Sequence, residues 1–391
     1  MDKKPEKLVP EVRFKGFTDD WEQRKLGKVA CINPKTNIPD NFKYVDLESV
    51  VGTSLIKAKL TTKQLAPSRA QRVAKKGDIF YQTVRPYQKN NFLFDINNYD
   101  FQYVFSTGYA QLRSEINNYF LFSYLQRQRF VNLILRRSTG TSYPAISSKD
   151  LSEIKIIFPR NSKEQENIGK IINLIDALIT LQQRKLEILI KLKQSFLTKI
   201  MANNIDKNPE LYFNSASIKW LKQELSNLTI KEFKGNTKLN DTKTGKTEYL
   251  DAERLNGNVP LFIDKPINTL KSDILILWDG SKAGSVYYGF EGSLGSTLKA
   301  IRLNPKLVNS FFVYQQLKSK QDVIFNKYRT PNIPHVIKNF TKVYPIYFPS
   351  MAVQNKIARF LGNLDTLIEI QQKSIKDHKV IKKYLLQKLF I

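Results

Sequence analysis

Four loops of this chain are rich in side chains that hydrogen-bond to nucleic-acid bases and phosphates. Two lie in the first half, at residues 82–91 and 136–144, and two at corresponding places in the second half, at residues 278–284 and 327–334. Arginine, lysine, glutamine and asparagine can pair with the edges of guanine or adenine, or grip phosphate. Any one of these side chains could simply be solvated; the match in position between the halves is what favours binding. The candidate residues are Arg85, Tyr87, Gln88, Lys89 and Asn90; Arg137, Ser138, Thr139, Ser142 and Tyr143; Trp278, Ser281 and Lys282; and Tyr328, Arg329, Thr330 and Asn332.

The residues that catalysis would need do not come together in this sequence. A methyltransferase acting on base amino groups needs an Asn/Asp-Pro-Pro-aromatic turn, and no Asn-Pro pair here is followed by a second proline. Gly245-Lys246-Thr247 imitates the end of a phosphate-binding loop, but Asn240 stands where its first glycine would have to be. One cysteine, Cys31, and two histidines, His335 and His378, are too few for a Cys/His zinc site. We therefore expect a binding protein without catalytic, cofactor-binding or metal-binding residues of its own.

The net charge favours nucleic acid as the partner. The 391 residues carry a formal charge of +28, and phosphate neutralisation over a large surface uses such a charge. An acidic protein partner and simple solvation of helix faces are the alternatives. No apolar run approaches the ~18 residues of a membrane span, and the first residues are charged rather than those of a signal peptide. With a single cysteine, which suits a reducing compartment, we expect a cytoplasmic protein with no membrane contact.

The elements that must position the four loops occur twice. The separation between matching residues falls from 199 at Trp21 and Trp220 to 189 at Asp176 and Asp365, and it stays constant along the helices that contain these aspartates. Loops tolerate deletions, whereas a helix that loses a residue rotates its apolar stripe. We predict an internal pseudo-two-fold duplication, with similar scaffolds and different surfaces.

Each copy has the pattern of an α+β domain with a mixed or antiparallel sheet. β-like runs lie at residues 78–81, 101–105, 154–158 and 273–277, and helix patterns at 117–137 and 309–327. Two longer helices are predicted at residues 165–201 and from 354 to about 390. The first would be roughly 55 Å long, and a single apolar stripe of that length needs a partner helix, so we predict an antiparallel coiled coil. Packing of each helix on its own globular domain is the alternative.

This pattern divides the chain into four segments. Residues 1–160 form a first globular domain with an N-terminal lead-in, and residues 161–205 a central helical spacer. Residues 206–350 form a second globular domain, and residues 351–391 a C-terminal helical spacer. Asparagine and proline at residues 203–209 read as the linker into the second half.

An ordered set of short motifs runs along the chain. The set consists of the Val-Pro-Glu-Val-Arg-Phe-Lys-Gly-Phe sequence at 9–17 with Trp21 and Lys25-Leu26-Gly27; Gly77-Asp78-Ile79; Thr139-Gly140-Thr141 with Ile146; and Phe158-Pro159 with Glu164-Gln165 and Ile168. In the second half, Ser272-Asp273-Ile274 and Thr330-Pro331 replace two of its members. No single motif is highly specific, but the ordered and duplicated set is. On this set, and over essentially its whole length, the sequence resembles a type I restriction–modification specificity subunit.

The resemblance implies two target recognition domains, each reading one half of a bipartite site in double-stranded DNA. It implies that the long helices set the gap between the half-sites and bind two modification (methyltransferase) subunits. Those subunits would supply S-adenosylmethionine and adenine N6 methylation. Restriction subunits would add translocation and cleavage with ATP and Mg²⁺.

Two other classes of function remain open at this stage. A self-contained DNA-modifying enzyme would transfer methyl groups as the isolated chain, and the missing cofactor motifs argue against it. A basic coiled-coil scaffold for acidic proteins would show no tight DNA binding at physiological salt.

Overall fold

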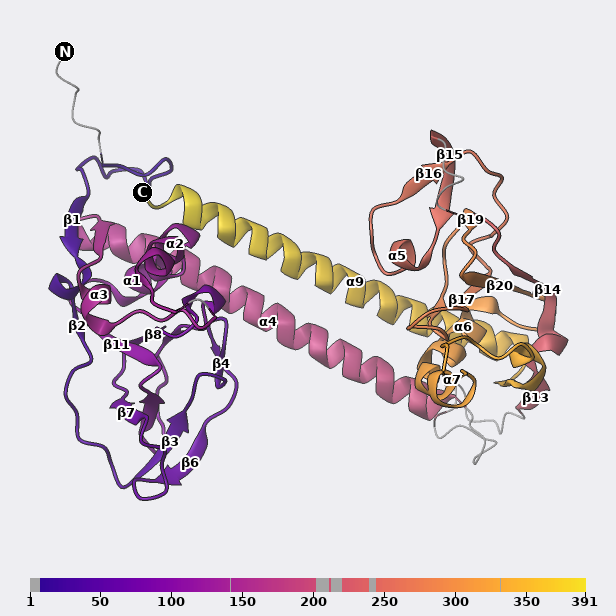
Figure 1. Ribbon diagram of the computed structural model, residues 1–391, viewed down its shortest axis with the longest axis horizontal. Coiled ribbons are helices and arrows are strands. Elements are labelled where there is room, and N and C mark those ends of the chain that lie inside the picture. Colours follow the sequence, from indigo (N-terminus) through magenta and orange to yellow (C-terminus); the bar gives the residue numbers. More distant parts are fainter. Residues whose placement is uncertain (1–7, 141, 202–210, 212–219, 239–243, 331) are drawn as a thin grey trace, which may run out of the picture. The chain divides into compact units, whose positions relative to one another are not determined.

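The computed structural model describes residues 8–140, 142–201, 211, 220–238, 244–330 and 332–391. The chain forms two compact units: Met1–Arg184 with Gln372–Ile391, and Lys185–Gln371. Both boundaries fall inside long helices, so each unit combines a globular domain with parts of both helices (Figure 1). The linker expected at residues 203–209, and the boundary expected at 205, lie outside the described residues. In the described parts, no helix is long and apolar enough to cross a membrane.

The globular part of the first unit is built on antiparallel and mixed β-sheets. Its strands are β1 (Glu22–Lys25), β2 (Ala30–Ile32), β3 (Asn41–Val45), β4 (Val50–Val51), β5 (Ser54–Leu55), β6 (Lys59–Thr62), β7 (Ala70–Val73), β8 (Ile79–Gln82), β9 (Phe92–Leu93), β10 (Tyr103–Ser106), β11 (Tyr109–Ser114) and β12 (Lys155–Phe158). One sheet has the order β6-β3-β10-β7, with β3 and β10 parallel, and another has the antiparallel order β2-β11-β8-β9. β1 pairs antiparallel with β12, which joins the two ends of the domain.

The helix predicted over residues 117–137 is two helices, α1 (Asn118–Leu125) and α2 (Gln128–Arg137). The prediction of one helix was wrong because Arg127 adopts an extended backbone, with φ −66° and ψ 141°. Every residue from Phe120 to Leu125 is buried, whereas α2 buries one face only. The break therefore turns the chain from a helix inside the core to a helix on its surface. Shorter helical segments are η1 (Leu26–Lys28), η2 (Pro86–Gln88) and α3 (Ser148–Ser152).

The second unit repeats these elements. Its strands are β13 (Leu221–Glu224), β14 (Thr229–Lys234), β15 (Thr244–Leu250), β16 (Leu261–Ile263), β17 (Ile274–Leu277), β18 (Val286–Tyr287), β19 (Ser293–Leu294), β20 (Leu298–Leu303) and β21 (Pro345–Phe348). They form sheets of order β14-β20-β17-β18 and β16-β15-β19, and β13 pairs with β21 as β1 does with β12. The helix predicted over 309–327 is also two helices, α6 (Ser310–Ser319) and α7 (Gln321–Lys327), with the break at Lys320. The other helical segments are η3 (Leu225–Leu228), α5 (Ala252–Leu255) and α8 (Phe340–Val343).

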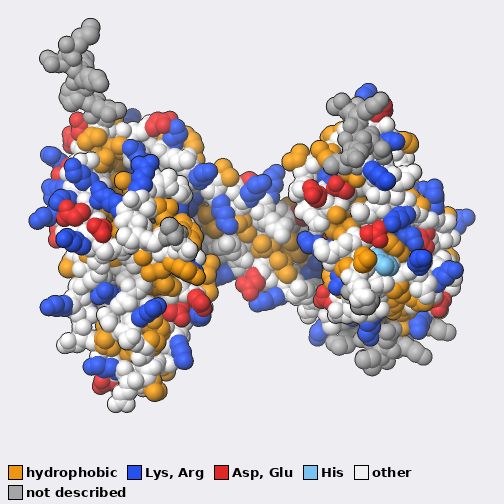
Figure 2. All heavy atoms as spheres, viewed as in Figure 1, with side chains coloured by type: hydrophobic (Ala, Val, Ile, Leu, Met, Phe, Trp, Pro, Cys, Tyr) orange, Lys and Arg blue, Asp and Glu red, His pale blue; other side chains and the backbone are white. Residues whose placement is uncertain are grey.

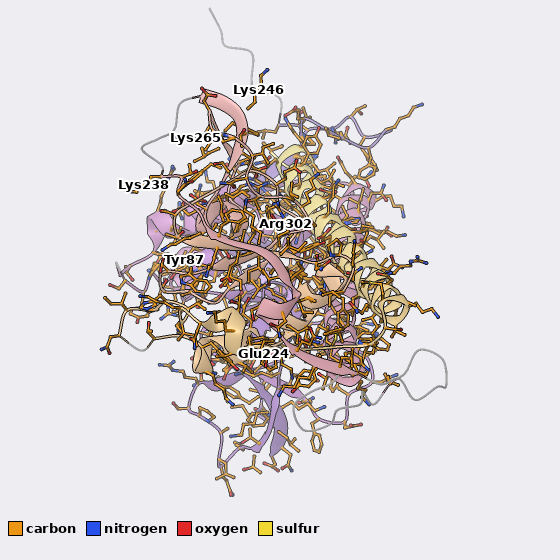
Figure 3. All side chains as sticks on the ribbon, turned by 90° about the vertical axis from the view of Figure 1, so that its right-hand side faces the viewer. Tyr87, Glu224, Lys238, Lys246, Lys265 and Arg302 are labelled. Carbon is orange, nitrogen blue, oxygen red and sulfur yellow. The ribbon has the colours of Figure 1, made fainter. Side chains whose placement is uncertain are left out.

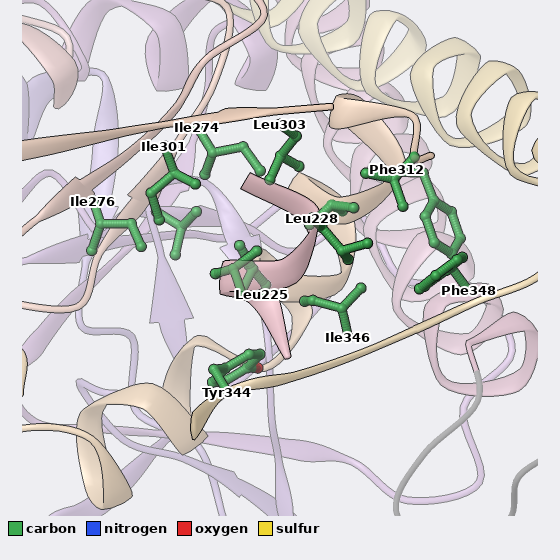
Figure 4. Packing of buried hydrophobic residues seen from close by; sticks show 14 of the residues in the cluster. Leu225, Leu228, Ile274, Ile276, Ile301, Leu303, Phe312, Tyr344, Ile346 and Phe348 are labelled. Carbon is green, nitrogen blue, oxygen red and sulfur yellow. The ribbon is translucent and has the colours of Figure 1, made fainter. Parts of the chain in front are cut away.

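The core of the second unit lies between its main sheet and α6. Leu225 and Leu228 of η3 pack with Ile274 and Ile301 of the sheet and with Phe312 of α6 (Figure 4). All five side chains are fully buried. Burial of one such aliphatic or aromatic side chain contributes about 1.5–3 kcal/mol, so this apolar cluster is a main source of the unit's stability.

The Gly-Lys-Thr sequence at residues 245–247 lies in β15, not in a phosphate-binding loop. A Cβ atom at Gly245 would come within 2.0 Å of the carbonyl oxygen of Ile263, so glycine allows the close pairing of β15 with β16. The Lys246 side chain is exposed and extends away from the ribbon (Figure 3).

Two long helices, α4 (Ser162–Ile200) and α9 (Met351–Lys388), follow β12 and β21. In the first unit Lys382 forms an ion pair with Asp176 at 2.5 Å, and in the second unit Lys193 forms one with Asp365. Both the aspartates and the lysines are 189 residues apart, so the two ion pairs are equivalent. A lysine late in one helix therefore meets an aspartate early in the other, which confirms the predicted antiparallel pair.

The end of each long helix completes a globular core. Leu389 and Phe390 belong to the core of the first unit, together with Trp21. Ile200 and Met201, which lie 189 residues earlier, belong to the core of the second unit. Each core is thus closed by residues that follow the other globular domain in the sequence.

A buried aspartate precedes β8 and again β17. Asp78 and Asp273 are at most 1% exposed, and each accepts two hydrogen bonds from an arginine on the neighbouring strand. The distances are 2.9 Å from Arg113 and 2.7–2.8 Å from Arg302. Each carboxylate also accepts a backbone N–H from three residues earlier. The Asp-Ile sequence found in both halves therefore anchors the strand that leads to a candidate loop.

Candidate nucleic-acid interface

The two loops predicted in the first half lie side by side in the first unit. The loop after β8 and the loop after α2 are joined through their backbones. Arg85 N donates to Pro144 O at 2.8 Å, and Val84 forms an antiparallel bridge with Ala145. Thr139 and Ala145 exchange two N–H···O bonds of 2.9 Å, which close the second loop. Residues about 60 positions apart in the sequence thereby form one surface.

Buried amide side chains hold the first loop in shape. Gln82 N donates to Asn91 Oδ1 at 2.7 Å, and Gln82 Nε2 donates to Gln88 Oε1 at 2.8 Å. Asn90 N donates to Gln82 Oε1 at 3.2 Å. Gln82 and Asn91 are each 1% exposed, and neither is among the candidate residues predicted from the sequence. Gln82 could have been recognised from the sequence, because a glutamine at the end of an otherwise apolar strand is expected to be buried. A buried amide needs hydrogen-bond partners, and the following loop is the nearest place for them.

Most candidate side chains of the first unit face solvent. Tyr87 is 49% exposed and Tyr143 is 61% exposed. No aspartate or glutamate occurs in residues 83–90 or 136–146, so the surface carries only positive charge. Lysine and arginine also gather more densely than acidic residues on the face shown in Figure 2. Gln88, Arg137, Thr139 and Ser142 are exposed as well, whereas Arg85, Lys89, Asn90 and Ser138 are half-buried.

The second unit joins its two candidate loops in the same way. Gly280 N donates to Pro334 O at 3.0 Å, and Asp279 forms an antiparallel bridge with His335. Thr330 N donates to His335 O at 3.0 Å. These bonds are the counterparts, in the same order along the chain, of the bonds in the first unit. The side chains are different, and the backbone frame is the same.

The candidate residues of the second unit divide between surface and core. Arg329 Nη1 donates to Ser281 O at 3.1 Å, and the Thr330 hydroxyl is bonded to Ile333 O. Trp278 is only 7% exposed and packs in the core, with Lys299 Nζ 4.1 Å from its ring centre. Ser281, Lys282 and Asn332 are exposed, whereas Tyr328, Arg329 and Thr330 are half-buried, Tyr328 against aromatic residues of the core.

Arg85 has a left-handed backbone, and its counterpart in the second unit is a glycine. Arg85 has φ 54° and Gly280 has φ 107°. The arginine side chain lies over the ring of Tyr143, with its guanidinium carbon 4.3 Å from the ring centre. A left-handed conformation costs a non-glycine residue roughly 1–2 kcal/mol. An arginine at this position therefore strains the backbone where a glycine would not. Such strain is typical of functional sites, so it indicates that the Arg85 side chain has a function.

The arrangement suits binding through hydrogen bonds, stacking and charge. Arginine, glutamine and asparagine beside exposed tyrosines can contact base edges and phosphates together. Among the described residues, no group of three or more histidine, cysteine, aspartate or glutamate side chains could hold a metal ion.

Comparison with known proteins identifies related sequences. A relative from Methanocaldococcus jannaschii, the type I restriction enzyme MjaVIII specificity subunit, is 33% identical over 37% of this chain and 35% of its own length. A putative type I specificity subunit from Mycoplasma genitalium is 26% identical over 64% of this chain and 65% of its own length. The chain thus matches less than two thirds of the length of either relative.

Solved structures and a family model extend the match to nearly the whole chain. The S subunit of a type I restriction-modification system from M. genitalium has the same fold, with a TM-score of 0.71 at 19% identity, over 98% of this chain and 99% of that one. A structure from work on complex assembly and conformational transition of the type I R-M system gives a TM-score of 0.53 at 20% identity, over 99% of both chains. These likenesses confirm the predicted fold. The model of the type I restriction modification DNA specificity domain matches residues 18–194 and 217–377. The chain therefore belongs to the type I restriction modification DNA specificity domain family.

Proposed function

We propose that this chain is the DNA sequence-specificity subunit of a type I restriction–modification complex. Each two-loop surface reads one half of a bipartite site in double-stranded DNA. The observation that carries the proposal is a backbone frame built twice with different side chains. Arg85 N to Pro144 O and Gly280 N to Pro334 O are the same bond in the two units. A matched frame fits two readers of one kind, and unmatched side chains fit two different half-sites.

Affinity and specificity come from different contacts. Phosphate contacts position a protein on DNA, and contacts to base edges provide sequence information. In the first unit, Arg85 and Gln88 can contact base edges, whereas Lys89 and Arg137 supply charge for phosphates. The excess of 63 lysines and arginines over 35 aspartates and glutamates supports a large phosphate footprint.

The reactions belong to partner subunits in this proposal. Two modification subunits bring S-adenosylmethionine and methylate adenine N6, and restriction subunits bring ATP and Mg²⁺. The equivalent ion pairs of α4 and α9 support two copies of one partner, because the two helices pair in the same way in both units. Both partner classes are those of the family.

The proposal is tested by DNA binding with the methylating partner present. We expect log K to fall linearly with log salt, and tight binding only for a duplex that contains both half-sites. The site is found by sequencing the methylated adenines in cells that carry the whole complex. Equal affinity for unrelated duplexes would contradict the proposal.

Replacing Arg85 by glycine separates its role in binding from its role in the fold. Glycine relieves a left-handed strain of about 1 kcal/mol but loses more chain entropy, so the free energy of unfolding should change by less than about 1 kcal/mol. Binding to the cognate duplex should weaken by about 1–3 kcal/mol, because the proposed function places Arg85 on a base edge. Denaturant unfolding and DNA titration measure the two effects.

Asn98→Gly is the matched control, because Asn98 is exposed and also has a left-handed backbone, with φ 52°. It changes the backbone in the same way and should leave DNA affinity unchanged. If Arg85→Gly and Asn98→Gly bind the cognate duplex with equal affinity, Arg85 does not contact a base.

A further inference from the structure

A strongly basic cavity lies in the first unit, beside the loop that follows β8. It has a volume of about 830 Å³ and lies between the α1–α2 break and the last turns of α9. Its lining contains no aspartate or glutamate. Six cationic residues line it: Lys89, Arg127, Arg129, Lys379, Lys382 and Lys383.

Little of this charge is balanced by the protein. Lys382 forms the ion pair with Asp176, and Arg127 Nη2 donates to an α-carboxylate oxygen of Ile391, which also lines the cavity. In the described part of the chain, no ion pair involves the other four cations. Two further donors in its wall, Arg127 Nη1 and Gln126 Nε2, are buried without an acceptor among the described residues. Buried donors without partners are uncommon, because each leaves a desolvation cost uncompensated.

The repulsion between these cations affects the pKa of Lys89. Burial lowers the pKa of its ammonium group, and the charges of Lys382 and Lys383 lower that pKa further. An anion between the three ammonium groups would raise the pKa of Lys89 again, because it favours the charged form of each lysine.

The duplication supplies an internal comparison. A cavity of about 430 Å³ occupies the equivalent place in the second unit, between α4 and the α6–α7 break. Asp365 lines it and forms an ion pair with Lys193. Two positions that carry lysines in the first cavity carry uncharged residues 189 positions earlier: Ile190 for Lys379, and Gln194 for Lys383. The helix pair therefore does not need lysines at these positions. The second cavity is lined by three lysines and one aspartate, whereas the first is lined by six cationic side chains and no acidic side chain, so the charge excess is larger in the first cavity.

We propose that the cavity between α2 and the end of α9 in the first unit binds a phosphate group. Lysine ammonium groups act on phosphate as point charges, and arginine adds directed N–H donors. The source is either the DNA backbone or a free phosphorylated small molecule. The DNA backbone is favoured because Lys89 belongs to the same loop as Arg85 and Tyr87, and in this form the inference rests on the proposed function.

The test uses the full chain and a charge-matched pair of variants. Lys379→Ile/Lys383→Gln gives the first cavity the residues of the second. Lys373→Gln/Lys376→Gln removes the same charge from exposed positions of α9, in the same unit and outside the cavity. Affinity for duplex DNA is measured against sodium chloride concentration. The cavity variant should bind roughly tenfold more weakly, with a salt slope less steep by about one unit. The control variant should stay close to the wild-type chain.

A second arm uses inorganic phosphate without DNA, at constant ionic strength. If phosphate raises Tm for the wild-type chain and the control but not for the cavity variant, while the DNA salt slopes agree, the ligand is a free phosphate. If the cavity variant and the control behave alike in both arms, the phosphate site is overturned. If the cavity variant then also fails to bind the modification subunit, Lys379 and Lys383 contact an acidic surface of that protein instead. Failure of the wild-type chain to bind duplex DNA would contradict the proposed function instead. The experiment with inorganic phosphate would still show whether the cavity binds phosphate.

Discussion

Replacing Phe390 by alanine is expected to destabilise the core of the first unit by about 4 kcal/mol. Phe390 is 4% exposed, although it lies two residues beyond the end of α9. Its ring centre lies 5.3 Å from that of Phe120, 5.9 Å from that of Tyr124 and 6.4 Å from that of Trp21. Truncation removes these contacts and leaves a cavity that the surrounding rings can only partly fill.

Hydrogen exchange measured by mass spectrometry locates this effect. Protection in α1 and α2 should fall steeply, and protection in β17 and α6 of the second unit should stay near that of the wild-type chain. Tyr384→Ala is the control, because Tyr384 lies in the last turns of α9 but is 52% exposed. If Phe390→Ala left the protection of α1 unchanged, the packing of α9 on this core would be contradicted.

Closure of each core by a distant helix end explains why the separation of 189 residues is kept along the helices. Phe390 and Met201 occupy equivalent places, one in each core. The ion pairs of Asp176 and Asp365 lie further along the same helices. An inserted residue would rotate the helix end by about 100° and remove its apolar side chains from the core. Loops carry no such constraint, and the separation drifts there.

Local patterns in the sequence were sufficient to predict the long helices and several strands. An apolar stripe at helical spacing and a run such as 79–82 report burial directly. The breaks at Arg127 and Lys320 have no comparable signal, since the same residues could continue a helix. They depend on the core that encloses α1 and α6, which local propensity does not describe.

The candidate site was only half accessible to sequence reasoning. Matched positions identified the four loops, but the pairing of loops within each unit depends on backbone bonds such as that from Arg85 N to Pro144 O. The left-handed backbone of Arg85 could not be predicted, because arginine seldom adopts this conformation. Trp278 looked like a surface aromatic residue and is buried, because aromatic residues serve cores and interfaces equally.

Exchanging residues 21–160 for the equivalent segment of another family member should change one half of the recognised site completely. The other half, and the gap between the halves, should stay the same. The segment is a natural unit because β1 and β12 pair at its two ends. Each mismatched base pair typically costs about 1–3 kcal/mol, so a half-site of several base pairs is discriminated by a thousandfold or more. Sequencing of methylated adenines gives the new site.

The contacts that cross the ends of this segment determine which exchanges will fold. Asn117 N donates to Gln165 Oε1 at 3.0 Å, and this backbone donor survives any substitution except proline. Phe120 and Tyr124 pack on Phe390, so the donor segment must keep aromatic residues there. A control exchange that retains the original residues 83–90 and 136–146 should restore the original half-site, since these loops carry the candidate contacts. A change in both halves of the site would contradict the two-reader arrangement, and failure of the retained loops to restore specificity would place the reading surface elsewhere in the domain.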